Sequence, residues 1–413
     1  MSYKKVEVGS LVTLRQGFAI NKKTLHHISE SPTSLHLLRI GDMKSGIFSV
    51  YVKDTIPERF IAKEDDVIYT RTGQVGLVFR RQHGVIHNNC FSVTTNDNEK
   101  LRQSFLYYVL QEKSFFEEAN SRATGAAQSD LPHDAFNSIR IPLPSVEKQD
   151  IITTILDQYN NLIENNEKQI KLLEEAAQRL YKEWFVDLRF PGYETTPIVD
   201  GVPEGWQRVS IGDLISYEIG GGWGEEEPTP KSETGAYVIR GTDLYGITHG
   251  ELLSIPYRYH SKSNLSSRIL LDGDIVFEVS GGSRTEGVAR TALIRAEMLE
   301  RWEKPVMCAS FCKLVRPSSP NLSQYIFDCF QYLRESGKTE KYDKRSASSI
   351  VNYRWKDFLL QEQLLKPSED VIEKYNCVAN YYSKIINCSL QIDSAKRSRD
   401  RLLPKLMTGE IEV

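Results

Sequence analysis

Residues 145–190 decide the fold of this chain, and they read SVEKQDIITTILDQYNNLIENNEKQIKLLEEAAQRLYKEWFVDLRF. Pro144-Ser145, where the stretch begins, is typical of a helix start, and Pro191-Gly192 after it is typical of a stop. Candidate inward positions recur at steps of three and four residues, as in a coiled-coil seam, and are Ile152, Ile155, Tyr159, Leu162, Asn166, Gln169, Leu173, Ala176, Leu180 and Trp184. The sequence therefore predicts one helix, roughly 60–65 Å long, which needs a partner helix.

A second stretch with the same features supplies that partner. Residues 367–405 also open with Pro-Ser and carry a second seam, formed by Tyr375, Val378, Tyr382, Ile385 and Ile392. Each seam follows a region of mixed strand-like and helix-like patterns. The chain is thus predicted to contain two copies of one unit, each a globular part followed by a long helix.

Short phrases recur in the same order in both globular parts. The pairs are Gly9-Ser10-Leu11 with Gly212-Asp213-Leu214, Arg39-Ile40-Gly41-Asp42 with Arg240-Gly241-Thr242-Asp243, and Asp65-Asp66-Val67-Ile68 with Gly273-Asp274-Ile275-Val276. Predicted helices from Ser104 and from Tyr325 also correspond. We predict an α+β fold with two tandem mixed α/β domains, residues 1–144 and 204–366. Residues 145–190 are predicted to form the first long helix, residues 191–203 a linker, and residues 367–413 the second long helix and the C-terminal tail.

Composition indicates an ordinary globular protein. The 413 residues are 40% hydrophobic and 26% charged, with a net charge of −3. We see no signal peptide and no run long enough to span a bilayer, so we expect a cytoplasmic protein. The six cysteines do not form paired metal-ligand motifs, which favours buried, reduced thiols over a zinc site.

Motifs for catalysis are mostly missing. The sequence has no P-loop, no H-E-x-x-H and no G-x-S-x-G motif. Residues 220–224, GGGWG, could cradle a phosphate, but no strand–glycine–helix pattern surrounds them, so a loop is the better interpretation. We therefore predict no catalytic residues and no metal site.

Two loops at corresponding places are candidates for binding DNA. The first, 69–76, offers Arg71, Thr72 and Gln74, and the second, 278–285, offers Ser280, Ser283 and Arg284. Arginine and glutamine can make paired hydrogen bonds to base edges. Further candidates are Arg80, Arg81, Gln128, Arg240, Lys344 and Arg345, of which the clustered basic residues suit phosphates. Polar turns and solvated charged surfaces are the alternative interpretation.

Phrases along the whole chain resemble the specificity subunits of type I restriction–modification systems. They are the closing RLLPKLMTGEI at 401–411, PEGW at 203–206, GDIV at 273–276, IPLP at 141–144 with the following Glu147 and Gln149, and LYKEWF at 180–185. Two departures occur. Lys148 separates Glu147 from Gln149, which are adjacent in the family, and the second helix lacks the glutamine at its start.

The resemblance implies a fold, a function and partners. Each globular part would be a target-recognition domain for one half of an asymmetric, bipartite sequence in double-stranded DNA, and the two helices would pair antiparallel as a spacer. The partners would be two modification subunits, which methylate adenine, and the restriction subunits, which are ATP-dependent translocases and nucleases. S-adenosylmethionine, ATP and Mg²⁺ are expected on those partners and no cofactor on this chain. The alternatives are a coiled-coil scaffold that does not bind DNA, and a nuclease with an unrecognised site.

Overall fold

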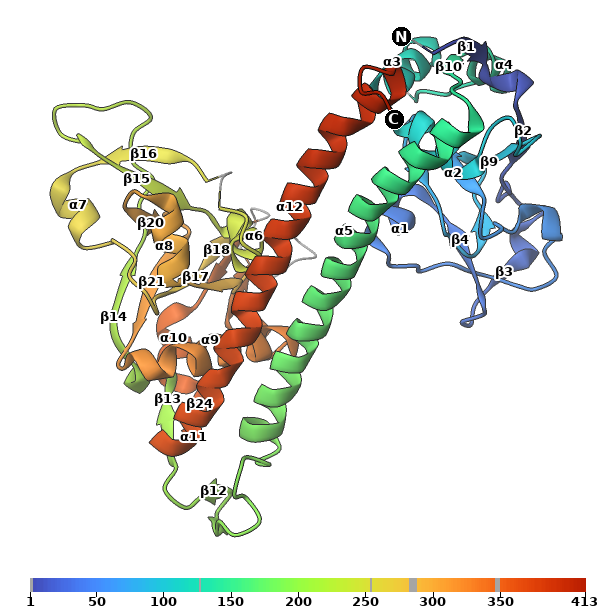
Figure 1. The fold of residues 1–413 in the computed structure, drawn as a ribbon. Coiled ribbons are helices and arrows are strands. Elements are labelled where there is room, and N and C mark those ends of the chain that lie inside the picture. Colours follow the sequence, from blue (N-terminus) through green and yellow to red (C-terminus); the bar gives the residue numbers. More distant parts are fainter. Residues whose placement is uncertain (1–2, 126–127, 253–254, 282–287, 346–349) are drawn as a thin grey trace. The chain divides into compact units, whose positions relative to one another are not determined.

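The computed structural model describes residues 3–125, 128–252, 255–281, 288–345 and 350–413 (Figure 1). The chain forms two compact units. Unit 1 contains Met1–Leu162 and Ser394–Val413, and unit 2 contains Ile163–Asp393. The division runs through both long helices, so each unit holds one sheet-containing domain and a segment of each helix. The domain boundaries given above stay predictions.

Unit 1 is built on two four-stranded sheets. One has the order β2 (Val12–Gln16), β9 (Cys90–Thr95), β6 (Val67–Thr70), β7 (Val78–Phe79), all antiparallel. The other has the order β3 (Ile28–Ser29), β5 (Tyr51–Val52), β4 (Leu35–Leu38), β8 (Val85–Ile86), in which β4 and β8 are parallel. Strand β1 (Lys5–Glu7) pairs with β10 (Arg140–Pro142), and the helices are α1 (Ile40–Ser45), α2 (Gln103–Gln111), α3 (Lys113–Arg122) and α4 (His133–Asn137).

Unit 2 repeats this topology, except that its second sheet contains three described strands where that of unit 1 has four. Its four-stranded antiparallel sheet has the order β14 (Ile215–Gly220), β21 (Cys312–Pro317), β17 (Ile275–Glu278), β19 (Thr291–Leu293). Its second sheet has the order β16 (Tyr257–His260), β15 (Thr234–Ile239), β20 (Val306–Cys308), with β15 and β20 parallel. Strand β13 (Gln207–Ser210) pairs with β24 (Gln363–Lys366), as β1 does with β10. The predicted internal repeat is confirmed.

Unit 2 also contains elements of its own. A third sheet has the order β18 (Ser280–Gly281), β23 (Val351–Tyr353), β22 (Asp343–Arg345). A short hairpin, β11 (Ile198–Val199) with β12 (Val202–Pro203), lies in the predicted linker. The helices of the domain are α6 (Leu244–Thr248), α7 (Lys262–Ser266), α8 (Ala296–Trp302), α9 (Ser323–Glu335) and α10 (Trp355–Gln361).

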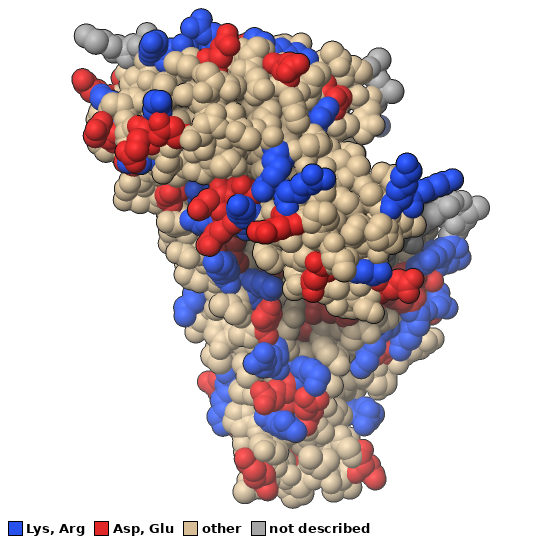
Figure 2. Space-filling model, turned by 90° about the vertical axis from the view of Figure 1, so that its right-hand side faces the viewer, with Lys and Arg blue, Asp and Glu red and all other residues tan. Residues whose placement is uncertain are grey.

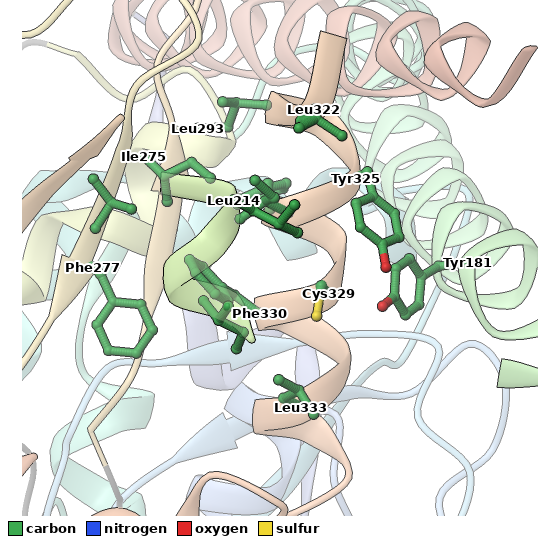
Figure 3. Close-up of a cluster of buried hydrophobic side chains, with 14 of the residues drawn as sticks. Tyr181, Leu214, Ile275, Phe277, Leu293, Leu322, Tyr325, Cys329, Phe330 and Leu333 are labelled. Atoms are coloured by element: carbon green, nitrogen blue, oxygen red, sulfur yellow. The ribbon is translucent and has the colours of Figure 1, made fainter. Parts of the chain in front are cut away.

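Helix α9 organises the core of unit 2. Its buried residues Tyr325, Cys329 and Phe330 face the sheet residue Phe277 on one side and Tyr181 of the first long helix on the other (Figure 3). Burial of such side chains contributes roughly 1.5–3 kcal/mol each. The same core thus holds the sheet-containing domain and the helix together within this unit.

The two long helices are antiparallel in each unit. They are α5 (Val146–Tyr181), which ends in a π-helical turn (Lys182–Val186), and α12 (Ala379–Thr408), preceded by α11 (Glu369–Tyr375). In unit 1, Arg399 Nη1 donates to Asn160 Oδ1 over 2.8 Å. In unit 2, Asn166 Nδ2 donates to Gln391 Oε1 over 3.1 Å. With two mixed α/β domains, each followed by a long helix, and antiparallel helices, the predicted fold class is confirmed.

The predicted seam of the first helix is wrong by one residue over much of its length. Leu162 is 41% exposed and Ala176 is exposed, whereas their neighbours Ile163 and Ala177 are buried. The offset begins at Leu156, which is buried in place of Ile155, and continues at Asn160, a polar residue that donates to Tyr108 and accepts from Arg399. The predicted Ile152 and Asn166 are buried. In the second helix the expected positions are buried, with Tyr382 partly so.

Two smaller expectations also fail. The first helix ends at Val186, not at Phe190. Cys377 is exposed, although the other five cysteines are buried. Among the described helices, none is both long enough and apolar enough to cross a membrane.

Candidate nucleic-acid interface

A pocket in unit 1 lies where the first candidate loop meets helix α1. It has a volume of about 610 Å³, and its lining residues are Ile40, Gly41, Lys44, Ser45, Thr72, Gly73, Gln74 and Asn89. We call it the first pocket. Helix α1 follows strand β4 in the chain, and the loop follows strand β6. Two of the predicted residues, Thr72 and Gln74, therefore line one pocket.

Arg71 is bound within the domain. Its Nε and Nη2 donate to the two carboxylate oxygens of Asp130 over 3.1 and 2.6 Å, and its Nη1 donates to Gln16 Oε1 over 3.0 Å. Thr72 Oγ1 also donates to Asp130. Hydrogen bonds from the Arg71 side chain, and then from Thr72, hold the pKa of Asp130 below its ordinary value, although burial acts in the opposite direction. The first loop is thus anchored through its arginine.

Glycines allow the first loop to turn back beside a second loop. Gly73 has φ of +87° and Gly76 has φ of +100°, and a Cβ at Gly76 would lie 2.4 Å from the Phe116 ring. The Gly73 amide donates to Ser129 O over 2.8 Å, and a Cβ at Gly73 would lie 3.8 Å from Gln128 Nε2. Gln128 is exposed, as is Gln74. The structure brings Gln128 beside the loop that carries Gln74.

The predicted basic pair Arg80 and Arg81 lies in different surroundings. The Arg80 guanidinium is partly buried, with its Nη2 2.8 Å from Asp157 Oδ1 and its centre 4.4 Å from the Tyr107 ring centroid. Burial alone would lower its pKa, but the neighbouring Tyr108 and Asp157 raise it. Arg80 therefore joins the domain to α5, whereas Arg81 is exposed.

The corresponding pocket of unit 2 has a different lining. Its volume is about 630 Å³, and its lining residues are Trp223, Arg240, Gly241, Thr242, Glu278, Ser280, Gly281, Arg290, Ala309, Ser310 and Phe311. We call it the second pocket. It lies between the residues after β15 and those after β17, the counterparts of β4 and β6. Two predicted residues, Arg240 and Ser280, line it.

Matched arginine–aspartate pairs stand at the start of the helix beside each pocket. Arg39 donates to both carboxylate oxygens of Asp42 over 2.7 and 2.9 Å. Arg240 does the same with Asp243 over 2.9 and 2.7 Å. In each pair, these hydrogen bonds raise the pKa of the arginine. Both guanidinium groups are partly exposed, so each pair holds a fixed positive group at the surface.

The polar side of the second pocket is fixed by internal contacts. Glu278 is buried and accepts from Arg290 Nε and Nη2 over 2.8 and 2.6 Å. Ser280 Oγ donates to Asn352 Oδ1 over 2.9 Å. In the third sheet, Asn352 also pairs in register with Lys344, so the three residues form one row. Lys344 and its neighbour Arg345 are exposed.

Two predicted residues, Ser283 and Arg284, lie outside the described residues. On the face shown in Figure 2, lysine and arginine side chains are interspersed with aspartate and glutamate and do not form one continuous basic surface. In the described parts of the chain, no three histidine, cysteine or acidic side chains are grouped as ligands for a metal ion. Local groups of residues thus define the two candidate sites.

Comparisons with known proteins agree with this architecture. Residues 2–175 match the family model described as the type I restriction modification DNA specificity domain. The type I restriction enzyme MjaIX specificity subunit of Methanocaldococcus jannaschii is 25% identical over 360 residues, which are 84% of this chain and 78% of that protein. The MjaVIII specificity subunit of the same organism is 27% identical over 183 residues, covering 43% of this chain and 41% of that protein.

A solved structure shares the fold. The crystal structure of the type I restriction–modification S subunit from M. genitalium has a TM-score of 0.62 and 13% sequence identity. The match covers 98% of this chain and 96% of that chain. The resemblance noted in the sequence is confirmed.

Proposed function

We propose that this chain, a type I restriction–modification specificity subunit, recognises an asymmetric bipartite sequence in double-stranded DNA. The observation that carries the proposal is the matched pair of pockets. The first pocket lies between residues that follow Arg39 and a strand-end loop, and the second lies between Arg240 and the corresponding loop. Two equivalent sites in one chain suit two half-sites of one target.

The linings of the pockets indicate that the half-sites differ. The first pocket presents Lys44, Thr72 and Gln74, all able to make hydrogen bonds. The second presents Arg240 beside the aromatic residues Trp223 and Phe311. Because base pairs in the major groove differ in their donors, acceptors and methyl groups, different linings favour different bases.

Individual residues receive different proposed functions. Gln74 and Gln128 would contact base edges, since both are exposed next to the first pocket. Arg71 would position the loop, because Asp130 and Gln16 already occupy its guanidinium. Arg240 would contact a base or a phosphate in the second half-site. Arg81, Lys344 and Arg345 are exposed and would contact phosphates, as would Lys44.

The long helices would serve as a spacer and as a docking surface for other subunits. The proposed partners are two modification subunits and the restriction subunits. S-adenosylmethionine, ATP and Mg²⁺ would be bound by those partners, and this chain would supply recognition without a catalytic centre of its own. A spacer of fixed length would set the separation of the half-sites.

The test is assembly followed by DNA binding. The chain is co-purified with a type I modification subunit, and binding to duplex DNA is measured from 50 to 200 mM salt. Binding that weakens steeply with salt indicates phosphate contacts. Binding unaffected by salt, or none, would favour a scaffold that does not bind DNA. Cleavage of DNA by the purified chain with Mg²⁺ alone would favour a nuclease.

A further inference from the structure

The second pocket has two exposed aromatic walls. Trp223 is 40% exposed and Phe311 is 53% exposed, and both line the pocket. Large exposed rings around one depression are typical of a surface that contacts a partner. No aromatic residue is among the described residues that line the first pocket. The two sites therefore differ in apolar character as well as in sequence.

Backbone packing fixes the two segments that carry the rings. The amides of Gly221 and Gly222 donate to Cys312 O and Cys308 O, each over 2.9 Å. A Cβ at Gly221 would lie 2.2 Å from the Cys308 carbonyl oxygen, so only glycine fits there. The glycine-rich stretch that carries Trp223 thus lies directly against the turn that carries Phe311.

A cation–π contact holds the Trp223 ring, and backbone hydrogen bonds hold the main chain of Phe311. The Arg258 guanidinium lies 4.7 Å from the Trp223 ring centroid and is paired with Glu226 over 2.7 Å. The Phe311 carbonyl accepts from the amides of Val279 and Ser280 over 2.9 and 3.1 Å. Phe311 is therefore tied to the strand-end loop, while its ring stays exposed.

Positively charged side chains lie around the rings, and the arginines among them are paired with carboxylates. Arg240 is held by Asp243 at the edge of the pocket and is 42% exposed. Lys344 and Arg345 are exposed on the sheet that contains Ser280. This charge complements a polyanion, which favours DNA over an apolar ligand as the occupant.

We propose that the second pocket contacts the C5-methyl group of a thymine in the major groove, with Trp223 and Phe311 as its apolar partners. This inference rests on the proposed function. Among the four normal bases, thymine is the one with a methyl group on its major-groove edge. Apolar side chains recognise that methyl group by contact. Only the half-site read by unit 2 would contain this contact.

The experiment removes the methyl group alone. The modification complex that contains the full chain is tested on duplexes of its target in which each thymine is replaced in turn by deoxyuridine. One replacement should weaken binding about fourfold, the effect of losing one buried methyl group. The sensitive position should lie in the half-site whose recognition is unchanged by Gln74→Ala. Phe311→Ala should remove the difference between thymine and uracil.

Controls separate this contact from general effects. Leu271→Ala removes another exposed apolar side chain of unit 2 that does not line the pocket, and it should keep the difference between thymine and uracil. Phe311→Leu keeps an apolar side chain and should keep part of that difference. Uracil tolerated at every position, or sensitivity only in the other half-site, would overturn the inference. A complex that binds target and scrambled duplexes equally would instead refute the proposed function.

Discussion

The Arg71 guanidinium and the Asp130 carboxylate form a two-pronged ion pair, with Nε–Oδ1 and Nη2–Oδ2 distances of 3.1 and 2.6 Å. The pair joins the loop after β6 to the segment before α4, 59 residues later in the chain. Gln16 and Thr72 complete the cluster. The donors with which Arg71 could contact a base are therefore already occupied within the domain. In this arrangement Arg71 positions the neighbouring residues of the loop.

Arg71→Ala and Asp130→Ala should have the same effect on recognition. Each removes the pair and releases the loop that carries Gln74, so discrimination in the first half-site should fall roughly tenfold. The double variant should be no worse than either single variant, because all three lose one interaction. Binding to single-base variants of both half-sites measures this, with Lys113→Ala as a control exposed elsewhere in unit 1. If only Arg71→Ala relaxed specificity, Arg71 would contact a base itself.

Gln74→Ala and Lys44→Ala should have different effects on DNA binding. Both residues line the first pocket, but an amide can distinguish bases, whereas an ammonium group suits phosphate. Gln74→Ala should relax preference by about 1–3 kcal/mol at one position of the first half-site and leave the second half-site unchanged. Lys44→Ala should weaken all sequences alike. A uniform loss for Gln74→Ala would contradict its proposed contact with a base.

Lys344→Ala should reduce the salt dependence of DNA binding. If Lys344 neutralises one phosphate, the slope of log affinity against log salt should fall by about one, on target and unrelated duplexes alike. Lys356→Ala, at another exposed position of the same unit, should leave the slope unchanged. An unaltered slope for Lys344→Ala would exclude a phosphate contact at this row of the sheet.

Asp328 should make the stability of unit 2 depend on pH. Burial raises its pKa to about 6, although Tyr382, Gln324 and Tyr375 donate hydrogen bonds to it. The unfolded chain has a pKa of about 4 for aspartate, so the folded state binds more protons between pH 4 and 6. The contribution of Asp328 to the free energy of unfolding should therefore decrease as pH rises through this range.

Asp328→Asn tests this dependence. The amide does not titrate, so the stability difference between variant and parent should change with pH by an amount of order 1–3 kcal/mol between pH 4 and 7. Urea unfolding at several pH values measures it, with the exposed Asp357→Asn as control. A difference that stays constant over this range would show that Asp328 is not protonated there.

Matched insertions test the proposed spacer. Residues near 164 on α5 and near 393 on α12 are opposite each other in the pairing, since Asn166 contacts Gln391 and Asn160 contacts Arg399. Seven residues added after Glu164 and seven after Asp393 preserve the seam and add about 10 Å of helix. The preferred spacer between half-sites should lengthen by about three base pairs. An unchanged spacer in a folded variant would reject this function of the helices.

The recurring motifs that revealed the repeat contain residues whose side chains hold the local structure of each domain. Asp66 and Asp274 are both buried, and each accepts a backbone amide three residues earlier and an arginine side chain, Arg15 or Arg316. Arg39 and Arg240 each pair with an aspartate three residues later. Such short-range geometry is visible in the sequence, and it predicted the repeat and the places of both loops.

Long-range partners were beyond the sequence. No sequence pattern predicts that Asp130 pairs with Arg71 or that Asp157 pairs with Arg80, because folding brings these residues together from distant segments. The aromatic wall of Trp223 and Phe311 was missed for the same reason. The glycines around Trp223 were a usable signal, since a run of glycines indicates close backbone contact.

The most direct test of sequence recognition by this chain is a map of methylated adenines in cells with and without it, together with a type I modification subunit. One asymmetric motif in two parts should be methylated only when the chain is present. Arg71→Ala should relax one part of that motif and leave the other intact. Methylation that is unchanged by deletion of the chain would contradict recognition by this chain.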